Sequence, residues 1–451
     1  MKTPLFFQRR FLPMWTALSF GAFADNMLRQ ALMIGVAFGW IATQGLDRAD
    51  DAIPIIGSVF AVSMLIFSSI AGQVAEKYET QRLFRVTKFA EVILMAIAAL
   101  GFYFNNGWFL IGVLFAMAAQ SAFFSPVRQG AMRKYLAADE LVRGNGLCNA
   151  GLYTSIVLGL FLGGLVIPGE NGRNMVGGLL FAASLVGFLA VLGAPKASPS
   201  APDLRLDFNV LTQGVSMIAR AFRARGVARP ILGWSFFFYV STLMTVLVPL
   251  YIKNSVNADE TTATLVMGAF GIGAGLGGVA ASLLARNRSA LGYSTFGVAA
   301  ASVLSLFAFL MTPFASSVAP QTASDFLGKP AGFAILVSFV LAASLMGLFV
   351  APLQAAVQRR APAHECARIL AAGNMMNAAF ALLGSLSVLL VTRTDADPRL
   401  ALLACALMQG CVALYMWRRR ARVPTGLYDE MLGSSAGHGE KARVPSGVEP
   451  C

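Results

Sequence analysis

The chain has 451 residues, of which 57% are hydrophobic and only 13% are charged, and its mean hydropathy is +0.67. A soluble core does not require so much apolar surface, whereas a lipid bilayer does, so an ordinary soluble enzyme is excluded. The five cysteines are odd in number and show neither a CxxC nor a His-paired spacing, which argues against a disulfide framework or a metal site.

Twelve apolar stretches are long enough to cross the hydrocarbon core of a bilayer. The six in the first half lie near residues 14–42, 53–75, 84–104, 107–130, 145–167 and 174–194. The six in the second half lie near residues 230–252, 262–285, 290–313, 331–357, 369–392 and 398–417. The first stretch contains Asp25 and lacks a small-residue cleavage site, so we interpret it as a transmembrane helix and not as a signal peptide. The predicted fold class is an all-α integral membrane protein with twelve transmembrane helices in two six-helix halves.

Lysine and arginine are distributed unevenly between the two sides of this arrangement. Alternate loops, together with both termini, hold 28 of the 35 Lys and Arg residues, and the loops of the other side hold 6. By the positive-inside rule both termini are then cytoplasmic. The net charge of +13 therefore reflects membrane topology and is no sign of nucleic-acid binding.

The twelve spans and the polar stretches between and after them divide the chain into four predicted regions. They are an N-terminal bundle over 1–194, a cytoplasmic linker over 195–229, a C-terminal bundle over 230–417 and a disordered cytoplasmic tail over 418–451. The linker becomes basic and amphipathic around Val210–Phe222, which fits either an interfacial helix or a solvated tether.

A segment of the first half recurs in the second half. Residues 123–149 align with a segment 225 residues later and share with it the following pairs: Gln129 and Gln354, Ala131 and Ala356, Ala138 and Ala363, Glu140 and Glu365, Arg143 and Arg368, Asn149 and Asn374. An offset of half the chain predicts two halves related as parallel repeats.

The first span carries Asp25, Asn26 and Arg29 within an apolar helix. A charged side chain at that depth needs a partner or a water-filled cavity. Asp25 and Arg29 are four residues apart and share a helix face, so they can form a self-neutralised structural pair. Alternatively, all three side chains face a central cavity and bind the charged or zwitterionic head group of a substrate, which is the interpretation that we favour.

The loop between the second and third spans contains Gly72, Glu76, Lys77 and Arg82. In degenerate form these residues resemble the cytoplasmic loop motif of the major facilitator superfamily. There the acidic residue caps a helix N-terminus in the other half and holds the inner gate shut, as the helix dipole favours. A solvated loop whose charges only enforce topology is the alternative. The departures from the motif, Glu76 for Asp and Glu79 for Gly, leave the strength of this gate open.

Both copies of the repeat contain a Glu-x-x-Arg pattern, at Glu140/Arg143 and at Glu365/Arg368. A glutamate at the start of a helix complements the helix dipole, and this structural role is sufficient for each copy alone. Because the pattern occurs in both halves, we expect these charges also to join gating networks at the inner face.

Asparagines follow each Glu-x-x-Arg pattern inside the spans. Asn149, Asn374 and Asn377 are predicted either to line the inner cavity or to form hydrogen bonds between helices. Glu91, three residues beyond Lys88, is expected to pair with it locally.

Sequence motifs of enzymes are missing. GIGAGLGG lies within an apolar span, where small residues let helices approach closely, and it is no nucleotide loop. There is no Walker motif, GxSxG or HExxH, and no paired groups indicate a membrane-embedded acyltransferase. We expect no catalytic residues, cofactor or metal.

Four segments together resemble the bacterial lysophospholipid transporter family of the major facilitator superfamily. They are FADNMLRQAL, AGQVAEKYETQRLFRVTKFAEV, FFSPVRQGAMRKYLAADELVRGNGL and FVAPLQAAVQRRAPAHECARILAAGNMMNAAFALLG. The same type of domain occurs fused to acyl-ACP synthetase/2-acylglycerophosphoethanolamine acyltransferase enzymes. The resemblance extends from Phe11 to about Arg420.

This resemblance implies a secondary transporter of the bacterial inner membrane that works by alternating access. It would move lysophosphatidylethanolamine and related lysophospholipids to the inner leaflet, where a separate acyltransferase would reacylate them. Asp25, Asn26 and Arg29 match the first-helix motif of the family, although Lys is common at the place of Arg29.

Two other functions stay open at this point. A proton-coupled exporter of drugs or small metabolites could use Asp25 as its coupling site. A receptor or scaffold is the other alternative, but paired halves and a gate motif favour a protein with moving parts.

Overall fold

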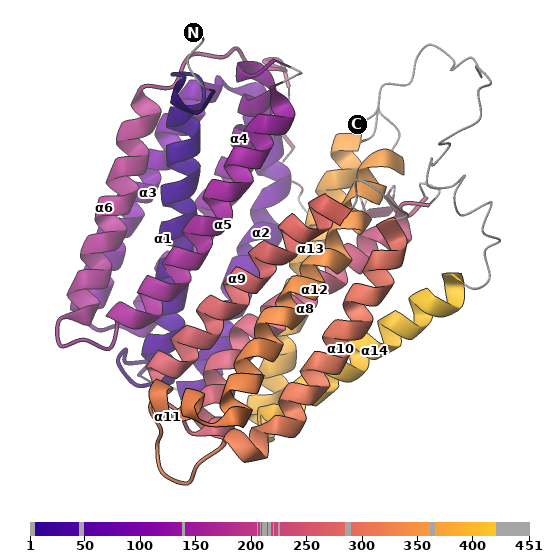
Figure 1. Ribbon diagram of the computed structural model, residues 1–451. Helices are drawn as coiled ribbons and strands as arrows, with labels where there is room; N and C mark the ends of the chain where they lie inside the picture. The colour runs from indigo at the N-terminus through magenta and orange to yellow at the C-terminus, as the bar shows by residue number, and fades with distance from the viewer. Residues whose placement is uncertain are drawn as a thin grey trace.

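The computed structural model describes residues 5–420 except 45–48, 138–139, 205, 208, 210–213, 215–217, 220, 224–225, 285–289 and 361–365. In this part of the chain twelve long helices confirm the predicted all-α fold (Figure 1). Those of the first half are α1 (Leu12–Ala37), α2 (Ala52–Lys77), α3 (Thr80–Tyr103), α4 (Gly107–Tyr135), α5 (Leu141–Val166) and α6 (Gly172–Leu192). Those of the second half are α8 (Ala228–Tyr251), α9 (Glu260–Leu284), α10 (Ala290–Ala315), α12 (Pro330–Arg360), α13 (Cys366–Arg393) and α14 (Arg399–Arg420).

Short helices occupy some of the connections. They are the 3₁₀ turns η1 (Leu5–Phe7) and η2 (Ala49–Asp51), the π turn η3 (Ile252–Val256) and the short helix α11 (Ala323–Gly328). The sequence did not predict α11, which begins with a capping box between Thr322 and Asp325. The amphipathic segment predicted around Val210–Phe222 falls largely outside the described residues.

Ten of the twelve long helices are long and apolar enough to cross a membrane by length and composition. The other two, α1 and α3, carry Asp25 with Arg29 and Lys88 with Glu91 in or near their middle. The chain is therefore a multi-pass membrane protein.

The helices of each half pack in the same order. In the first half α1 packs on α5, α3 on α6 and α2 on α4; in the second half α8 packs on α13, α10 on α14 and α9 on α12. A repeat-related pair of glycines makes one of these contacts possible in both halves. A Cβ atom on Gly159 would lie 2.6 Å from the carbonyl oxygen of Phe23, and one on Gly384 would lie 2.5 Å from that of Tyr239. This correspondence supports the predicted parallel repeat.

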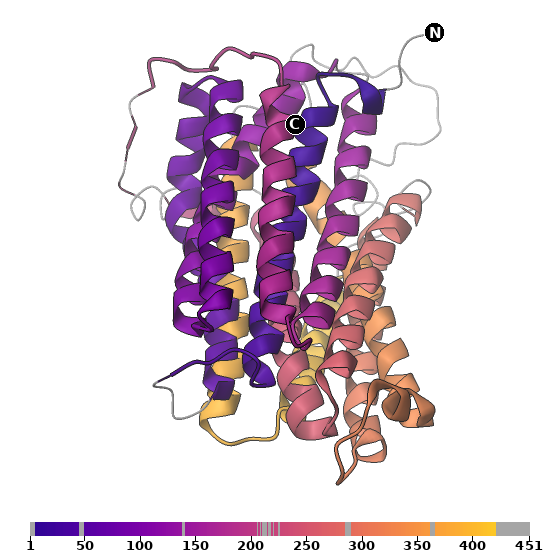
Figure 2. The same ribbon diagram turned by 90° about the vertical axis from the view of Figure 1, so that its left-hand side faces the viewer.

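The two halves touch through α2 with α13 and through α5 with α9 (Figure 2). We call the end of the molecule where α1 begins and α2 ends the basic end, because Arg9, Arg10, Lys77 and Arg82 lie there. The other end, where α1 ends and α11 lies, is the opposite end. In Figure 1 the halves lie together at the opposite end and diverge toward the basic end.

Candidate functional site

The polar side chains of α1, Asp25, Asn26 and Arg29, are held by hydrogen bonds. Asp25 and Arg29 do not bind each other directly, although their four-residue spacing would allow it. Ser121 Oγ in α4 donates to Asp25 Oδ2 at 2.6 Å. Arg29 Nη2 donates to Asn26 Oδ1 at 2.9 Å, and Asn26 Nδ2 donates to the carbonyl of Ala22 at 2.8 Å. Within the described chain, Asp25 Oδ1 and Arg29 Nε have no hydrogen-bond partner and no ion pair joins the two residues. The direct Asp25–Arg29 pair is therefore not formed.

A second charged pair lies beside this cluster, in α3. Lys88 Nζ and Glu91 Oε2 are 2.6 Å apart, and both side chains are only 1% exposed. This distance confirms the predicted local pairing of Lys88 with Glu91. The pair lies inside the helix bundle and not at its surface. The ammonium group of Lys88 also lies 4.4 Å from the centroid of the Phe124 ring. Gly21 of α1 leaves the space for Lys88, because a Cβ atom there would collide with Nζ.

Gln120 and Ser121 of α4 connect the two charged sites. Gln120 Nε2 donates to Glu91 Oε2 at 3.2 Å, and Ser121 Oγ lies 3.4 Å from Gln120 Oε1. A continuous polar chain therefore runs from Asp25 through α4 to Lys88, inside the N-terminal helices. Buried charges are tolerated only with such partners. The sequence analysis missed Gln120 and Ser121, because a lone Gln-Ser pair in an apolar span carries no spacing signal.

The three predicted asparagines occupy different environments. Asn377 is 4% exposed and accepts a hydrogen bond from Ser235 Oγ of α8 at 3.0 Å, which matches the interhelical alternative. Asn149 and Asn374 are exposed. At 100° per residue, Asn149 lies on the face of α5 that carries Leu160, a contact of α9, and Asn374 lies on the face of α13 that carries Ser385, a contact of α2. Both asparagines thus lie on the helix faces through which the two halves contact each other, but nearer the basic end, where the halves diverge.

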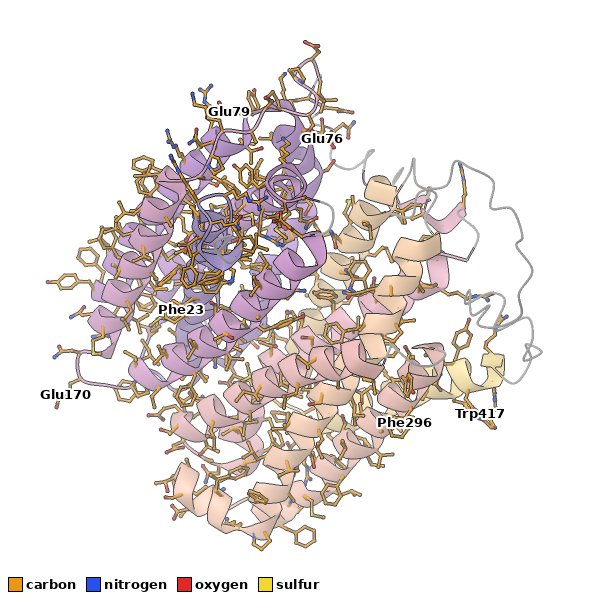
Figure 3. The ribbon with its side chains drawn as sticks, turned by 45° about the horizontal axis from the view of Figure 1, so that its top comes forward. Phe23, Glu76, Glu79, Glu170, Phe296 and Trp417 are labelled. Carbon is orange, nitrogen blue, oxygen red and sulfur yellow. The ribbon has the colours of Figure 1, made fainter. Side chains whose placement is uncertain are left out.

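The loop motif lies at the basic end, at the junction of α2 and α3. Figure 3 shows Glu76 and Glu79 at this end, with Glu170 at the other end of the same bundle. The side chain of Glu76 is exposed and has no hydrogen bond or ion pair among the described residues, and a Cβ atom on Gly72 would meet nothing within 4 Å. Arg82 is also exposed, and Lys77 Nζ lies 5.9 Å from the Tyr78 ring centroid. In this conformation Glu76 does not cap any helix start of the other half that the structure describes.

The start of the linker packs over this loop. The amides of Ser200 and Ala201 donate to the carbonyl of Glu76 at 3.0 Å. Lys134 Nζ donates to the carbonyl of Ser198 at 2.8 Å, and Tyr135 Oη donates to that of Pro195 at 2.7 Å. Burial and the nearby Glu79 carboxylate raise the pKa of Tyr135 to about 12, so it stays a hydrogen-bond donor at neutral pH. The linker is thus attached to the N-terminal helices.

Glu140 forms an ion pair within the N-terminal bundle. Its Oε1 atom lies 2.6 Å from Arg10 Nη2, and its Oε2 atom accepts the amide of Ala137 at 3.0 Å. Glu140 stands at the N-cap position of α5 but makes no side-chain hydrogen bond to the first turn of that helix, so its role toward the helix dipole stays a prediction. Arg143 lies in α5 and Arg368 in α13, where their side chains are not described, and Glu365 lies outside the described residues.

Two adjacent aspartates join the halves at the opposite end. Asp50 Oδ1 lies 3.0 Å from Lys253 Nζ, and its Oδ2 atom accepts from Asn254 Nδ2 at 2.8 Å. Asp51 Oδ2 lies 3.0 Å from Arg393 Nε, and its Oδ1 atom accepts from Thr392 Oγ1 at 2.9 Å. We call these contacts the Asp50–Asp51 clamp. Sequence reasoning missed it, although two acids beside a span and basic residues at the far ends of α8 and α13 were visible.

Comparison with known proteins agrees with this architecture. The sequence profile of the Major Facilitator Superfamily matches residues 16–385. The lysophospholipid transporter LplT of Photorhabdus laumondii is 25% identical over 267 residues, which cover 58% of this chain and 63%, less than two thirds, of the relative. LplT of Salmonella schwarzengrund is 23% identical over 413 residues, which cover 88% of this chain and 92% of the relative.

Solved structures of transporters have a similar fold. The nucleoside transporter NupG superimposes with a TM-score of 0.65 at 12% identity, covering 91% of this chain and 99% of that one. An auto-inhibited POT family peptide transporter gives a TM-score of 0.63 at 13% identity, covering 91% and 97%. At these identities the likeness concerns the fold alone.

Proposed function

The chain belongs to the major facilitator superfamily, and from this premise we propose that it moves lysophospholipids across the membrane by alternating access. It is a transporter and not an enzyme. Relatives that carry the name lysophospholipid transporter match up to 88% of the chain, which supports the substrate class. Lysophosphatidylethanolamine, moved from the outer to the inner leaflet, is the substrate that we expect.

The observation that carries this proposal is the partly unsatisfied charge on α1. Asp25 Oδ1 and Arg29 Nε are buried without hydrogen-bond partners, whereas most buried polar atoms of proteins have one. The zwitterionic head group of lysophosphatidylethanolamine offers an ammonium group for a carboxylate and a phosphate for a guanidinium group. We propose that Asp25, Asn26 and Arg29 bind this head group, with Asn149 and Asn374 in the cavity wall and Asn377 as a support between helices.

Alternating access needs two gates, and the contacts of the chain suggest where they lie. The Asp50–Asp51 clamp holds the halves together at the opposite end, while Glu76 at the basic end is without a partner among the described side chains. We propose that this conformation is closed at the opposite end and open at the basic end. The predicted inner gate would then form when the molecule reverses, with Gly72, Lys77, Arg82 and the two Glu-x-x-Arg patterns taking part.

We further propose the bacterial inner membrane as the location, with both termini in the cytoplasm, because the loops and termini on one predicted side of the membrane hold 28 of the 35 Lys and Arg residues. The product would then arrive where a separate acyltransferase or acyl-ACP synthetase can reacylate it. A division into bundles over 1–194 and 230–417, a linker over 195–229 and a tail over 418–451 stays part of the proposal, and the end of α6 at Leu192 and the start of α8 at Ala228 support its first two boundaries.

The test uses purified protein in liposomes and follows inward movement of fluorescent lysophosphatidylethanolamine. Wild type is compared with Asp25→Asn and Arg29→Ala, and Glu170→Gln at the exposed opposite end serves as the charge-matched control. Loss of movement in both α1 variants, with folding and the control intact, would support the proposal. If folded wild type moved no lysophospholipid but a proton gradient drove export of an amphiphilic drug, the proposal of a lysophospholipid transporter would give way to that of a proton-coupled exporter.

A further inference from the structure

Two arginines from separate segments converge on the end of α6 at the basic end. Arg85 of α3 donates from Nη2 to the carbonyl oxygen of Leu192 at 3.2 Å. Arg9, which precedes α1, donates from Nε to the carbonyl oxygen of the next residue, Gly193, at 3.3 Å. The two guanidinium groups are therefore fixed on neighbouring carbonyl groups and lie close together.

No carboxylate neutralises this pair of cations within the described chain. Neither Arg9 nor Arg85 takes part in an ion pair there, and the two acids of the neighbouring loop, Glu76 and Glu79, pair with neither of them. A guanidinium group has five N–H donors, and each arginine uses one of them on described residues. Both side chains are exposed, so the other donors are open to an anion.

The surface that continues from these cations toward the middle of the membrane is apolar. Val86 and Phe89 of α3 and Leu189 of α6 are each more than half exposed. Phe89 is four residues beyond Arg85 on the same helix face, and its ring centroid lies 5.6 Å from that of Phe188 in α6. We call this surface the α3–α6 rim, and it comprises Arg9, Arg85, Val86, Phe89, Leu189 and Leu192.

The α3–α6 rim lies on the outside of the N-terminal bundle. The helix α3 packs on α6 and α4, and α6 packs on α3 and α1. In Figure 1 both helices lie on the side of the molecule that faces away from α10 and α14. An occupant of the rim therefore comes from the surrounding bilayer and not from the path between the two halves.

The chemistry of the rim selects an anionic phospholipid over a zwitterionic one. Arginine binds phosphate oxygens through two parallel N–H donors, and the apolar side chains below offer contact to acyl chains. A zwitterionic head group would bring its own ammonium group close to two guanidinium groups, whereas an anionic head group adds no positive charge. The proposed orientation places the basic end in the cytoplasmic leaflet, whose surface is negatively charged.

We propose that the α3–α6 rim binds an anionic phospholipid of the bilayer, with its phosphate between Arg9 and Arg85 and its acyl chains along α3 and α6. One phosphate then joins the segment before α1 to α3, at the place where the linker leaves α6. This site is separate from the proposed head-group site on α1, and it does not depend on which substrate the protein moves.

The first test measures lipid binding to the full chain in detergent by native mass spectrometry. Phosphatidylglycerol is the anionic probe, and phosphatidylethanolamine with the same acyl chains is the zwitterionic one. A cation near a membrane surface strengthens binding of anionic lipid about fivefold, so Arg9→Gln with Arg85→Gln should weaken phosphatidylglycerol binding about 25-fold. Binding of phosphatidylethanolamine should not change.

The matched control is Arg418→Gln with Arg419→Gln, which removes two exposed arginines from the end of α14 and changes the net charge equally. This variant should bind phosphatidylglycerol as wild type does. An equal loss of binding in both double variants would show that only the total charge attracts the lipid, and it would overturn the site.

The second test uses wild type and so does not depend on the folding of a variant. Protein in liposomes is irradiated with phosphatidylglycerol that carries a diazirine in its acyl chains, and the adducts are mapped by mass spectrometry. Adducts should concentrate on the peptides that contain Val86, Phe89 and Leu189. Excess unlabelled phosphatidylglycerol should remove them, and excess lysophosphatidylethanolamine should not. Adducts spread evenly over α3, α6, α10 and α14, or displaced by the lysophospholipid, would refute the proposal.

Discussion

Asp51 of the first half and Arg393 of the second half lie 3.0 Å apart and form part of a clamp between residues separated by most of the chain. The neighbouring pair, Asp50 with Lys253, repeats the arrangement: both acids lie in η2, and the bases lie in η3, directly after α8, and at the end of α13. In the proposed alternating-access cycle, two ion pairs of this kind would favour the state that is closed at the opposite end.

Removing the clamp should shift the molecule toward the state open at the opposite end. Partly exposed ion pairs contribute roughly 0.5–1 kcal/mol each, so Asp50→Asn or Asp51→Asn should change the equilibrium about two- to fivefold. Ser385→Cys in a cysteine-free background reports this change, because Ser385 is buried against Gly57 of α2. Thiol labelling should speed up by that factor.

Arg399→Gln is the control for the clamp. Its partner Asp397 lies in the same connection at 2.8 Å, so the pair is within one half. Equal acceleration in this variant would show that any lost charge loosens the opposite end and would contradict the assignment.

Reversal of the molecule should protect the two repeat-related asparagines. Asn149→Cys and Asn374→Cys should react readily with a hydrophilic thiol reagent in the present conformation, because both positions are exposed on inter-half faces. Adding Asp51→Asn should slow both reactions about two- to fivefold as the basic end closes. Glu170→Cys, an exposed position at the other end of the same bundle, should react equally fast in either background. Unchanged rates at both asparagine positions would place them outside the moving interface.

Substitutions of Arg29 should show whether head-group binding depends on the charge of this residue alone or also on the planar shape of its guanidinium group. Arg29→Gln should weaken lysophosphatidylethanolamine binding roughly tenfold or more, since a hydrogen bond to a charged group contributes about 1.5–3 kcal/mol. Arg29→Lys should retain part of the affinity, because it keeps the charge but loses the planar fork. Equilibrium binding to purified protein measures this, with Arg173→Gln as the control. Equal affinity of all variants would remove Arg29 from the site.

The buried pair of α3 should depend on both of its members. Lys88→Met or Glu91→Leu alone leaves an unpaired buried charge and should destabilise the fold by about 3 kcal/mol, whereas the double variant should recover much of that loss. Thermal unfolding in detergent measures the effect, with exposed Arg82→Gln on the same helix as the control. A double variant as unstable as the sum of the single variants would argue against a pair.

Glycine packing should matter equally in the two halves. Gly159→Ala and Gly384→Ala each place a Cβ atom against a carbonyl oxygen of the neighbouring helix, and overpacking of this kind costs about 1–3 kcal/mol. Gly275→Ala on α9 should be tolerated, because a Cβ atom there would meet nothing within 4 Å. Comparable stability of all three variants, in the same unfolding assay, would show that the helices can move apart at no cost.

Much of the fold was predictable because its signals are local. The length of each apolar run reports whether a helix can cross the bilayer, and the alternation of basic loops reports its direction. The repeat offset of 225 residues also predicted a structural relation, which Gly159 and Gly384 display in equivalent packing positions. Local spacing likewise predicted the Lys88–Glu91 pair.

The sequence by itself therefore determined the helices, the two halves and the charge on α1. Only the tertiary structure decided what that charge contacts. Asp25 and Arg29 share a helix face, yet Asp25 accepts a hydrogen bond from Ser121, because the packing of α1 on α4 places that hydroxyl 2.6 Å from its carboxylate. The Asp50–Asp51 clamp likewise joins segments that are far apart in the chain. Such contacts depend on the packing of one helix against another, which the periodicity of a single segment does not encode.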